Sequence, residues 1–132
     1  MGDRQRVSTG TKWEELYGYS RGIRTGNSIQ IAGTTATDEN GQVVGGDDPY
    51  EQTRFIFQKI ERALNALGGT LEDVVRTRLY VVQGVPWEPV ARAHGDLFSE
   101  IRPANTVIYI AGLIGDQYLV EVEVDAIVED SE

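Results

Sequence analysis

The chain of 132 residues contains no cysteine, a single histidine and only two lysines. Without cysteine there can be no disulfide framework, thiolate zinc site or cysteine nucleophile. One histidine also argues against the usual zinc-hydrolase ligand sets, which use two or three, so we expect no metal site. No apolar run approaches the ~18 residues of a membrane span, and the amino terminus lacks the apolar segment of a secretory signal. We therefore expect a cytoplasmic protein that does not contact a membrane.

Positive charge is also scarce, since 12 Lys and Arg stand against 21 Asp and Glu, a net charge of −9. Nucleic-acid binding draws most of its affinity from basic residues that neutralise phosphates. Here the only close basic pair on a regular element is Arg76 and Arg78. The charge therefore disfavours a polynucleotide partner. With 40% hydrophobic and 25% charged residues, the composition is typical of an ordinary globular protein, and the length fits one domain over residues 1–132.

Turn signals and apolar periodicity predict five strands and two helices in the order β-β-α-β-α-β-β. The clearest helix is expected at 49–67, where Asp48 can cap the first turn, Pro49 suits the first helical position and Gly68 can supply the left-handed stop. Residues 1–16 are predicted to be a loose lead-in with Trp13 as an aromatic anchor. The strands are expected at 19–25, 28–34, 74–82, 104–113 and 118–128, and the second helix at 87–101.

Two helices are too few to cover both faces of a sheet, so the pattern predicts an α+β sandwich with one mixed sheet and both helices on one face. Side chains alternate between the two faces of a strand. The last strand therefore has a wholly aliphatic face, which belongs under the helices, and an opposite face that carries Glu121, Glu123 and Asp125. We assign Val75, Thr77, Leu79 and Val81 to the helix side, and Asn105, Val107 and Tyr109 to the charged side.

The charged side has two possible roles. It can be a solvated face with cross-strand ion pairs, each worth only tenths of a kcal/mol. Alternatively, other copies of the chain cover it in a closed ring, where Arg76 and Arg78 meet the acids away from bulk water. We favour the ring, and a pocket in so small a domain would then lie between subunits.

Three segments resemble a known family. They are Gly-Tyr-Ser-Arg-Gly at 18–22 with Ile-Ala-Gly-Thr-Thr at 31–35, Arg-Pro-Ala-Asn-Thr-Val at 102–107, and Leu-Val-Glu-Val-Glu at 119–123. In order and spacing, over about residues 17–128, they resemble the RidA/YjgF family of reactive intermediate deaminases, also labelled endoribonuclease L-PSP. The resemblance implies a chorismate-mutase-like fold that forms a homotrimeric barrel with small-molecule clefts at the subunit interfaces. It also implies hydrolysis of 2-imino or enamine acids to 2-keto acids and ammonia, without a cofactor.

The resemblance assigns roles to individual residues. Glu121 matches the catalytic glutamate that positions water, Tyr19 matches the aromatic residue of the cleft, and Gly33 is kept. Other positions of the substrate-binding set differ: Ala32 stands where the family has serine, and Ala91 where an asparagine is expected. Asn105 replaces the arginine that holds the substrate carboxylate, and Val107 completes the predicted substrate-binding set.

The change at position 105 alters the expected ligand. A neutral amide cannot reproduce the bidentate pairing of guanidinium with carboxylate. A cleft with Asn105 and Glu121 but no cation should also repel an anion. We therefore predict weak or absent activity on 2-imino acids and a neutral or cationic ligand. A non-catalytic metabolite-binding or regulatory trimer is the alternative, and a ribonuclease or translation inhibitor is a third that the net charge disfavours most.

Other candidate sites have simpler interpretations. His94 lies on the apolar stripe of the second expected helix, which favours a hydrogen-bonded packing residue over a general base. The acids at 121, 123 and 125 could suggest a metal, but Arg76 and Arg78 can neutralise them. The Gly-Gly pair at 45–46 precedes a helix without a Walker lysine, so we interpret it as a loop. Trp13 and Trp87 are expected at packing or interface positions.

Overall fold

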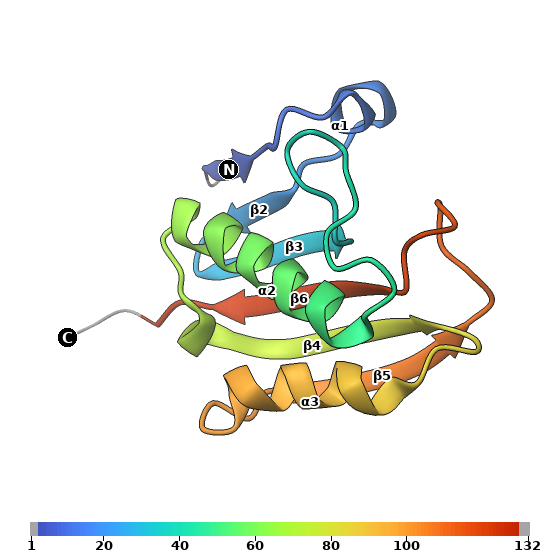
Figure 1. The fold of residues 1–132 in the computed structure, drawn as a ribbon. Coiled ribbons are helices and arrows are strands. Elements are labelled where there is room, and N and C mark those ends of the chain that lie inside the picture. Colours follow the sequence, from blue (N-terminus) through green and yellow to red (C-terminus); the bar gives the residue numbers. More distant parts are fainter. Residues whose placement is uncertain (1–2, 130–132) are drawn as a thin grey trace.

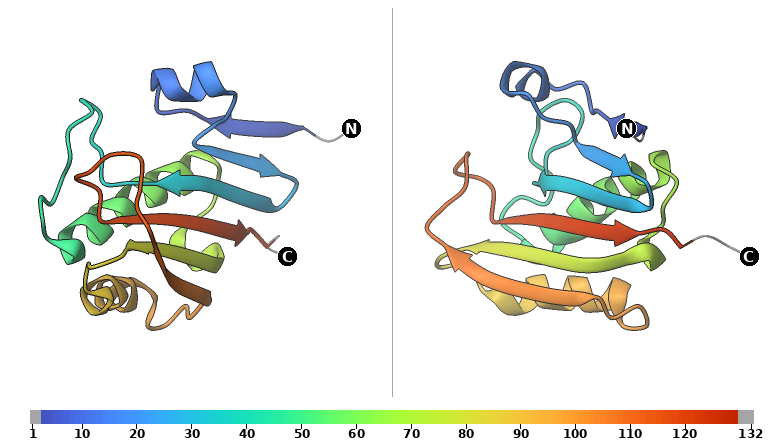
Figure 2. Two further views of the ribbon diagram at one scale, coloured as in Figure 1. Left: turned by 90° about the vertical axis from the view of Figure 1, so that its right-hand side faces the viewer. Right: turned by 180° about the vertical axis from the view of Figure 1, so that it is seen from behind.

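A six-stranded mixed sheet in the order β1-β2-β3-β6-β4-β5 organises the computed structural model, which describes residues 3–129. Helices α2 and α3 both pack on one face of this sheet, and the other face carries no helix (Figures 1 and 2). The predicted α+β architecture is therefore confirmed. The elements are β1 (Arg4–Val7), α1 (Lys12–Tyr17), β2 (Gly22–Thr25), β3 (Ser28–Thr34), α2 (Pro49–Ala66), the short 3₁₀ turn η1 (Leu71–Asp73), β4 (Val74–Val82), α3 (Trp87–Phe98), β5 (Ala104–Ile110) and β6 (Val120–Ile127).

The long helix α2 follows the signals of its sequence. Asp48 caps it by accepting hydrogen bonds from the backbone N–H groups of Tyr50 and Glu51. Gly68, just beyond its end, has a positive φ of 85°, a conformation that glycine adopts without steric cost. The apolar stripe of α2 is buried against the aliphatic side of β6. The other predicted elements are present, but α3, β2, β5 and β6 are each shorter than predicted.

The amino-terminal segment differs from the expected loose lead-in. Arg4–Val7 forms an edge strand that pairs antiparallel with β2, with Arg4 opposite Thr25. Lys12–Tyr17 then forms a short helix that ends at Gly18 in the left-handed region. Strand β1 is too short and polar to show an apolar alternation, which is why its sequence gave no strand signal. Met1 and Gly2 lie outside the described residues.

Two face assignments made from alternation are wrong. In β4, Val74 is opposite Ala126 while Arg76 is opposite Asp125, so a bulge places two β4 residues over a single step of β6. Val74 is consequently buried, and Val75 is 43% exposed rather than under the helices.

The second correction concerns β5, which pairs parallel with β4. Thr77 lies opposite Asn105 and Leu79 opposite Val107, so Asn105 and Val107 share the helix face with the buried side of β4. Tyr109 follows them to that face, because it pairs with the buried Val81. Apolar residues occur on both sides of this edge strand, and only the pairing register settles which side faces the helices.

Candidate active site

Glu121 lies on the helix-free face of β6, beside a bulge in β3 between Ile31 and Thr34. The bulge brings Gly33 against the Glu121 carboxylate, so that a Cβ added at Gly33 would lie 2.6 Å from Oε2. The carboxylate is half-buried, and no Lys, Arg or His among residues 3–129 forms an ion pair with it. Burial, with a smaller contribution from Glu123, raises the pKa of Glu121, and Arg21 opposes the rise. The arrangement suits a group that takes up and releases a proton.

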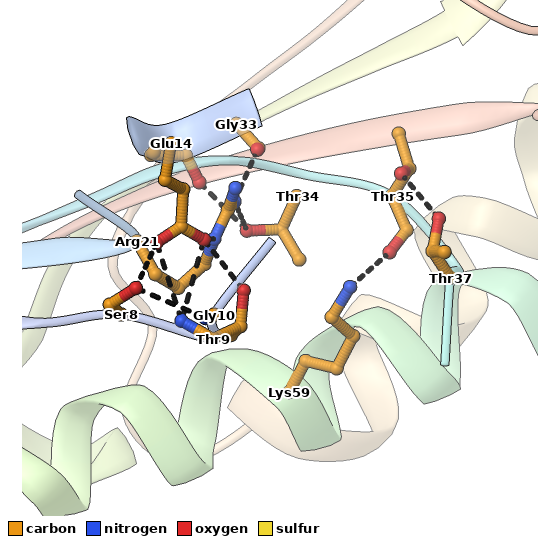
Figure 3. A network of polar contacts seen from close by, with 11 residues as sticks. Ser8, Thr9, Gly10, Glu14, Arg21, Gly33, Thr34, Thr35, Thr37 and Lys59 are labelled. Atoms are coloured by element: carbon orange, nitrogen blue, oxygen red, sulfur yellow. Dashed lines mark hydrogen bonds and ion pairs between the residues drawn. The ribbon is translucent and has the colours of Figure 1, made fainter. Parts of the chain in front are cut away.

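Arg21 holds the backbone of the bulge through hydrogen bonds (Figure 3). Its Nη1 donates to the carbonyl oxygen of Gly33 at 2.6 Å and to Oγ1 of Thr34 at 3.1 Å. Its Nε lies 3.7 Å from the carboxylate of Glu14. Sequence reasoning did not assign a role to Arg21, although the residue belongs to the segment 18–22 that carried the family resemblance.

The carboxylate of Glu14 is buried and is surrounded by hydrogen-bond donors. The hydroxyls of Ser8 and Thr9 both donate to it at 2.6 Å, and the backbone N–H of Thr9 adds a longer contact (Figure 3). Burial alone would raise the pKa of Glu14, but the hydrogen bonds from Ser8 and Thr9, together with Arg21, lower it below its ordinary value. Glu14 therefore stays ionised and balances much of the charge of Arg21, which leaves less of that charge for Glu121.

Lys59 of α2 approaches the same stretch of β3 from the helix side (Figure 3). Its Nζ donates to the carbonyl oxygen of Thr35 at 3.0 Å. Burial, reinforced by the positive charges of Arg21 and Arg62, lowers the pKa of Lys59 to about 8. Backbone carbonyls on either side of Thr34 are thus held by two cationic side chains, and this fixes the position of the bulge.

Tyr19 and Ala32 lie close to the bulge. Both line a shallow depression of about 410 Å³, together with Arg6, Gly18, Ser20, Ile23, Gln30 and Ile31. Tyr19 is 42% exposed, and its ring centre lies 5.8 Å from the guanidinium carbon of Arg21. Four residues predicted from the sequence, Tyr19, Ala32, Gly33 and Glu121, therefore occupy one region of the chain.

The other three predicted site residues lie elsewhere. Ala91 is half-buried on α3, and Asn105 and Val107 belong to edge strand β5. Asn105 is exposed and donates through Nδ2 to Oγ1 of Thr77 at 2.9 Å, whereas Val107 packs against the core. Since Asn105 and Glu121 are on opposite faces of the sheet, a single copy of the chain does not bring the whole predicted set together.

The charged face of the sheet is organised around Arg78. Its Nη1 lies 3.2 Å from Asp125 and 3.8 Å from Glu123, which also accepts a hydrogen bond of 2.9 Å from the Tyr80 hydroxyl. Arg76 instead donates to the hydroxyl of Thr106. Arg78 thus forms cross-strand ion pairs within the chain, as expected for the solvated-face alternative, and Arg76 turns toward β5.

The structure also bears on the remaining candidates. His94 is half-buried, packs against Phe57 and Phe98, and is hydrogen-bonded to Thr77, which confirms its interpretation as a packing residue. Within residues 3–129, no group of three or more His, Asp or Glu side chains is placed to hold a metal ion. In the same part of the chain, no helix has both the length and the apolar character to cross a membrane.

Comparison with known proteins identifies the family. A family model described as Endoribonuclease L-PSP matches residues 10–128. A crystal structure from Mycobacterium tuberculosis, of a member of the YjgF/YER057c/UK114 family, matches with a TM-score of 0.86 and 41% identity, covering 96% of this chain and 100% of that chain. The chain therefore belongs to the RidA/YjgF family, and the resemblance found in its sequence segments is confirmed.

Two further relatives differ in what their names state. An uncharacterized protein of Streptomyces coelicolor is 38% identical over 122 residues, which cover 92% of this chain and 90% of that protein. The 3-aminoacrylate deaminase RutC of Acinetobacter baylyi is 27% identical over 104 residues, which cover 79% of this chain and 82% of that protein.

Proposed function

We propose that the protein hydrolyses reactive enamine or imine metabolites, with a preference for substrates less anionic than 2-imino acids. The observation that carries this function is the Glu121 carboxylate, which is half-buried, lacks an ion-pair partner among the described residues and occupies the space beside Gly33 that a side chain there would need. A relative named as a 3-aminoacrylate deaminase supports the same reaction class.

The reaction needs only water and a proton carrier. An enamine gains a proton at carbon and becomes the iminium ion, and Glu121 then takes a proton from water as the water oxygen attacks the iminium carbon. Glu121 returns that proton to the nitrogen of the resulting carbinolamine, and the C–N bond breaks as the hydroxyl group releases its proton, which yields a carbonyl product and ammonia. A carboxylate whose pKa is raised by burial is a stronger base than a solvated one, so it is suited to take the proton from water and to return it to nitrogen.

The substrate cleft is assigned to the interface between copies of the chain in a homotrimer. Two groups of predicted site residues, one around Glu121 and one around Asn105, lie on opposite faces of the protomer's sheet, so a neighbouring copy can supply the second group to the first. The helix-free face also exposes Ile108 and Ile127, 46% and 48% accessible, beside its ionic side chains. Covering such a mixed face with another copy removes apolar area from water.

A non-catalytic metabolite-binding trimer is the second candidate. Ala32 offers no hydroxyl to a ligand, and Asn105 offers no charge, so two of the family's polar contacts are missing from the predicted set. Such a cleft could bind a ligand without turning it over. We do not extend the proposal to RNA cleavage, because a net charge of −9 opposes phosphate binding.

The test is turnover of 2-aminoacrylate and of its primary amide, both generated in situ, with release of ammonia as the readout. We expect measurable hydrolysis of the amide and slower hydrolysis of the acid. Glu121→Gln should abolish both, and Glu72→Gln, which alters an exposed acid on η1, should abolish neither. Saturable binding of either compound without ammonia release would favour the binding trimer. A species of only 14.6 kDa in light scattering would remove the interfacial cleft.

A further inference from the structure

A chain of hydrogen bonds runs from the core to the exposed edge of the sheet. Nε2 of His94 lies 2.8 Å from Oγ1 of Thr77, which in turn accepts from Nδ2 of Asn105 at 2.9 Å. Thr77 is completely buried, whereas Asn105 is exposed on edge strand β5. Residue 105 is thus connected to the interior through a single hydroxyl group.

The number of available protons fixes the direction of this chain. A threonine hydroxyl has one proton, and because its oxygen accepts from Asn105, that proton is free to go to His94. Nε2 of His94 must then be an unprotonated acceptor, with the ring proton on Nδ1. If Nε2 carried a proton, both His94 and Asn105 would donate to the Thr77 hydroxyl oxygen. The buried threonine proton would then have no acceptor.

The surroundings of the imidazole agree with a neutral ring. His94 packs edge to face on Phe57 and at 4.7 Å between ring centres on Phe98, with Thr77 at Nε2. None of these groups carries charge. Burial lowers the pKa of His94 below its ordinary value, so the neutral form persists at physiological pH.

We propose that His94 and Thr77 are positioning residues that turn the Asn105 amide so that its Oδ1 faces the ligand, which selects ligands with an N–H donor at this point. Because Nδ2 already donates one of its protons to Thr77, the side of the amide that faces away from Thr77 presents Oδ1 and the second N–H group. A primary amide offers the complementary donor and acceptor. A carboxylate offers acceptors alone and places a negative oxygen against Oδ1. This inference rests on the proposed function, in which Asn105 lines the substrate cleft.

The protonation pattern can be tested without any ligand. The chain has a single histidine, so ¹⁵N NMR of the imidazole reports on His94 alone. We expect an unprotonated Nε2 and a protonated Nδ1 in the wild type at neutral pH. Thr77→Val removes the donor to Nε2 and should shift the tautomer population, and Thr77→Ser, which keeps a hydroxyl, should restore the wild-type signals. A proton on Nε2 in the wild type would overturn the inference.

The ligand preference is tested with pyruvamide and pyruvate, stable neutral and anionic carbonyl probes, titrated into the protein. We expect pyruvamide to bind about tenfold more tightly than pyruvate. This ratio should fall toward one in Thr77→Val and be retained in Thr77→Ser. Equal or tighter binding of pyruvate by the wild type overturns the inference and leaves the proposed hydrolysis intact. If neither probe binds and the turnover assay releases no ammonia, both this inference and the proposed hydrolysis are overturned.

Discussion

The carboxylate of Glu121 on β6 occupies the space that a side chain on Gly33 of β3 would need. A Cβ at this position would lie 2.6 Å from Oε2 and 2.9 Å from Cδ of Glu121. The backbone of the bulge therefore sets where the carboxylate can lie. Arg21 holds that backbone through the Gly33 carbonyl, so the position of the proposed catalytic group also depends on Arg21.

Substitution of Gly33 by alanine should displace the Glu121 carboxylate and leave the fold largely unchanged. The colliding atoms are at the free end of a flexible side chain, so rotation of Glu121 relieves the clash. A misplaced catalytic group costs one to two orders of magnitude in rate, and we expect about a tenfold to hundredfold loss of imine hydrolysis. The melting temperature should change little.

The matched control for this substitution is Gly95→Ala. Gly95 is exposed on α3, and a Cβ there would meet nothing within 4 Å. It should stabilise the protein by roughly 0.5–1 kcal/mol through helix propensity, without loss of activity. Full activity in Gly33→Ala would show that the contact with Glu121 does not position the reacting group.

Glu121→Gln should be more stable than the wild type at neutral pH. The folded-state pKa of Glu121 is raised above its ordinary value of 4.5. Its favourable contribution to the free energy of unfolding is therefore complete below pH 4.5, and it is lost as pH rises through the folded-state pKa. The advantage of the variant should therefore grow between pH 4 and pH 8 in denaturant titrations. Glu14→Gln should show the reverse, a deficit at pH 7 that shrinks toward acid, because the pKa of Glu14 is lowered. Parallel pH profiles for the two variants would contradict both assignments.

The elements that sequence reasoning predicted well are those whose signals are local. Helix α2 carries its cap, its apolar stripe and its terminal glycine within one continuous segment, and its observed end differs from the prediction by a single residue. The region around Glu121 and Gly33 was found because the residues of two family segments lie on neighbouring strands.

The features that sequence reasoning missed depend on pairing between distant segments. Asn105 was placed on the wrong face, because alternation along β5 does not say which side meets the helices, and the register with Thr77 does. The bulge that exposes Val75 likewise exists only where β4 meets β6. Arg21 holds Gly33 through a hydrogen bond between residues 12 positions apart, and the apolar periodicity of the sequence does not predict such a contact.

Asn105→Arg should convert the proposed ligand preference to carboxylates. Guanidinium pairs with carboxylate through two parallel hydrogen bonds, and a hydrogen bond to a charged group is worth about 1.5–3 kcal/mol, so pyruvate binding should tighten about tenfold to hundredfold. Arginine can also donate to Thr77, as Asn105 does. Asn105→Lys supplies the charge without the planar fork and should give a smaller gain. Unchanged pyruvate affinity in both variants would indicate that residue 105 does not face the ligand.

Lys59 should make folding stability depend on pH in the alkaline range. Its pKa is lowered from 10.5 to about 8 by burial and by Arg21 and Arg62. Between these two values the unfolded chain binds more protons than the folded one, so the free energy of unfolding attributable to Lys59 rises as pH increases from 8 to 10.5 and is lost as pH falls through 8. Lys59→Met also removes the bond to the Thr35 carbonyl, but that loss shifts stability by a nearly constant amount at every pH.

The difference between wild type and Lys59→Met, measured by urea unfolding, should consequently move in favour of the wild type across this range. Lys12, the only other lysine, is exposed on α1, and Lys12→Met provides the control. A difference that stays constant from pH 8 to 10.5 would mean that Lys59 is as well solvated in the folded chain as in the unfolded one. The Thr35 carbonyl would then be held by a solvated ammonium group and not by a buried one.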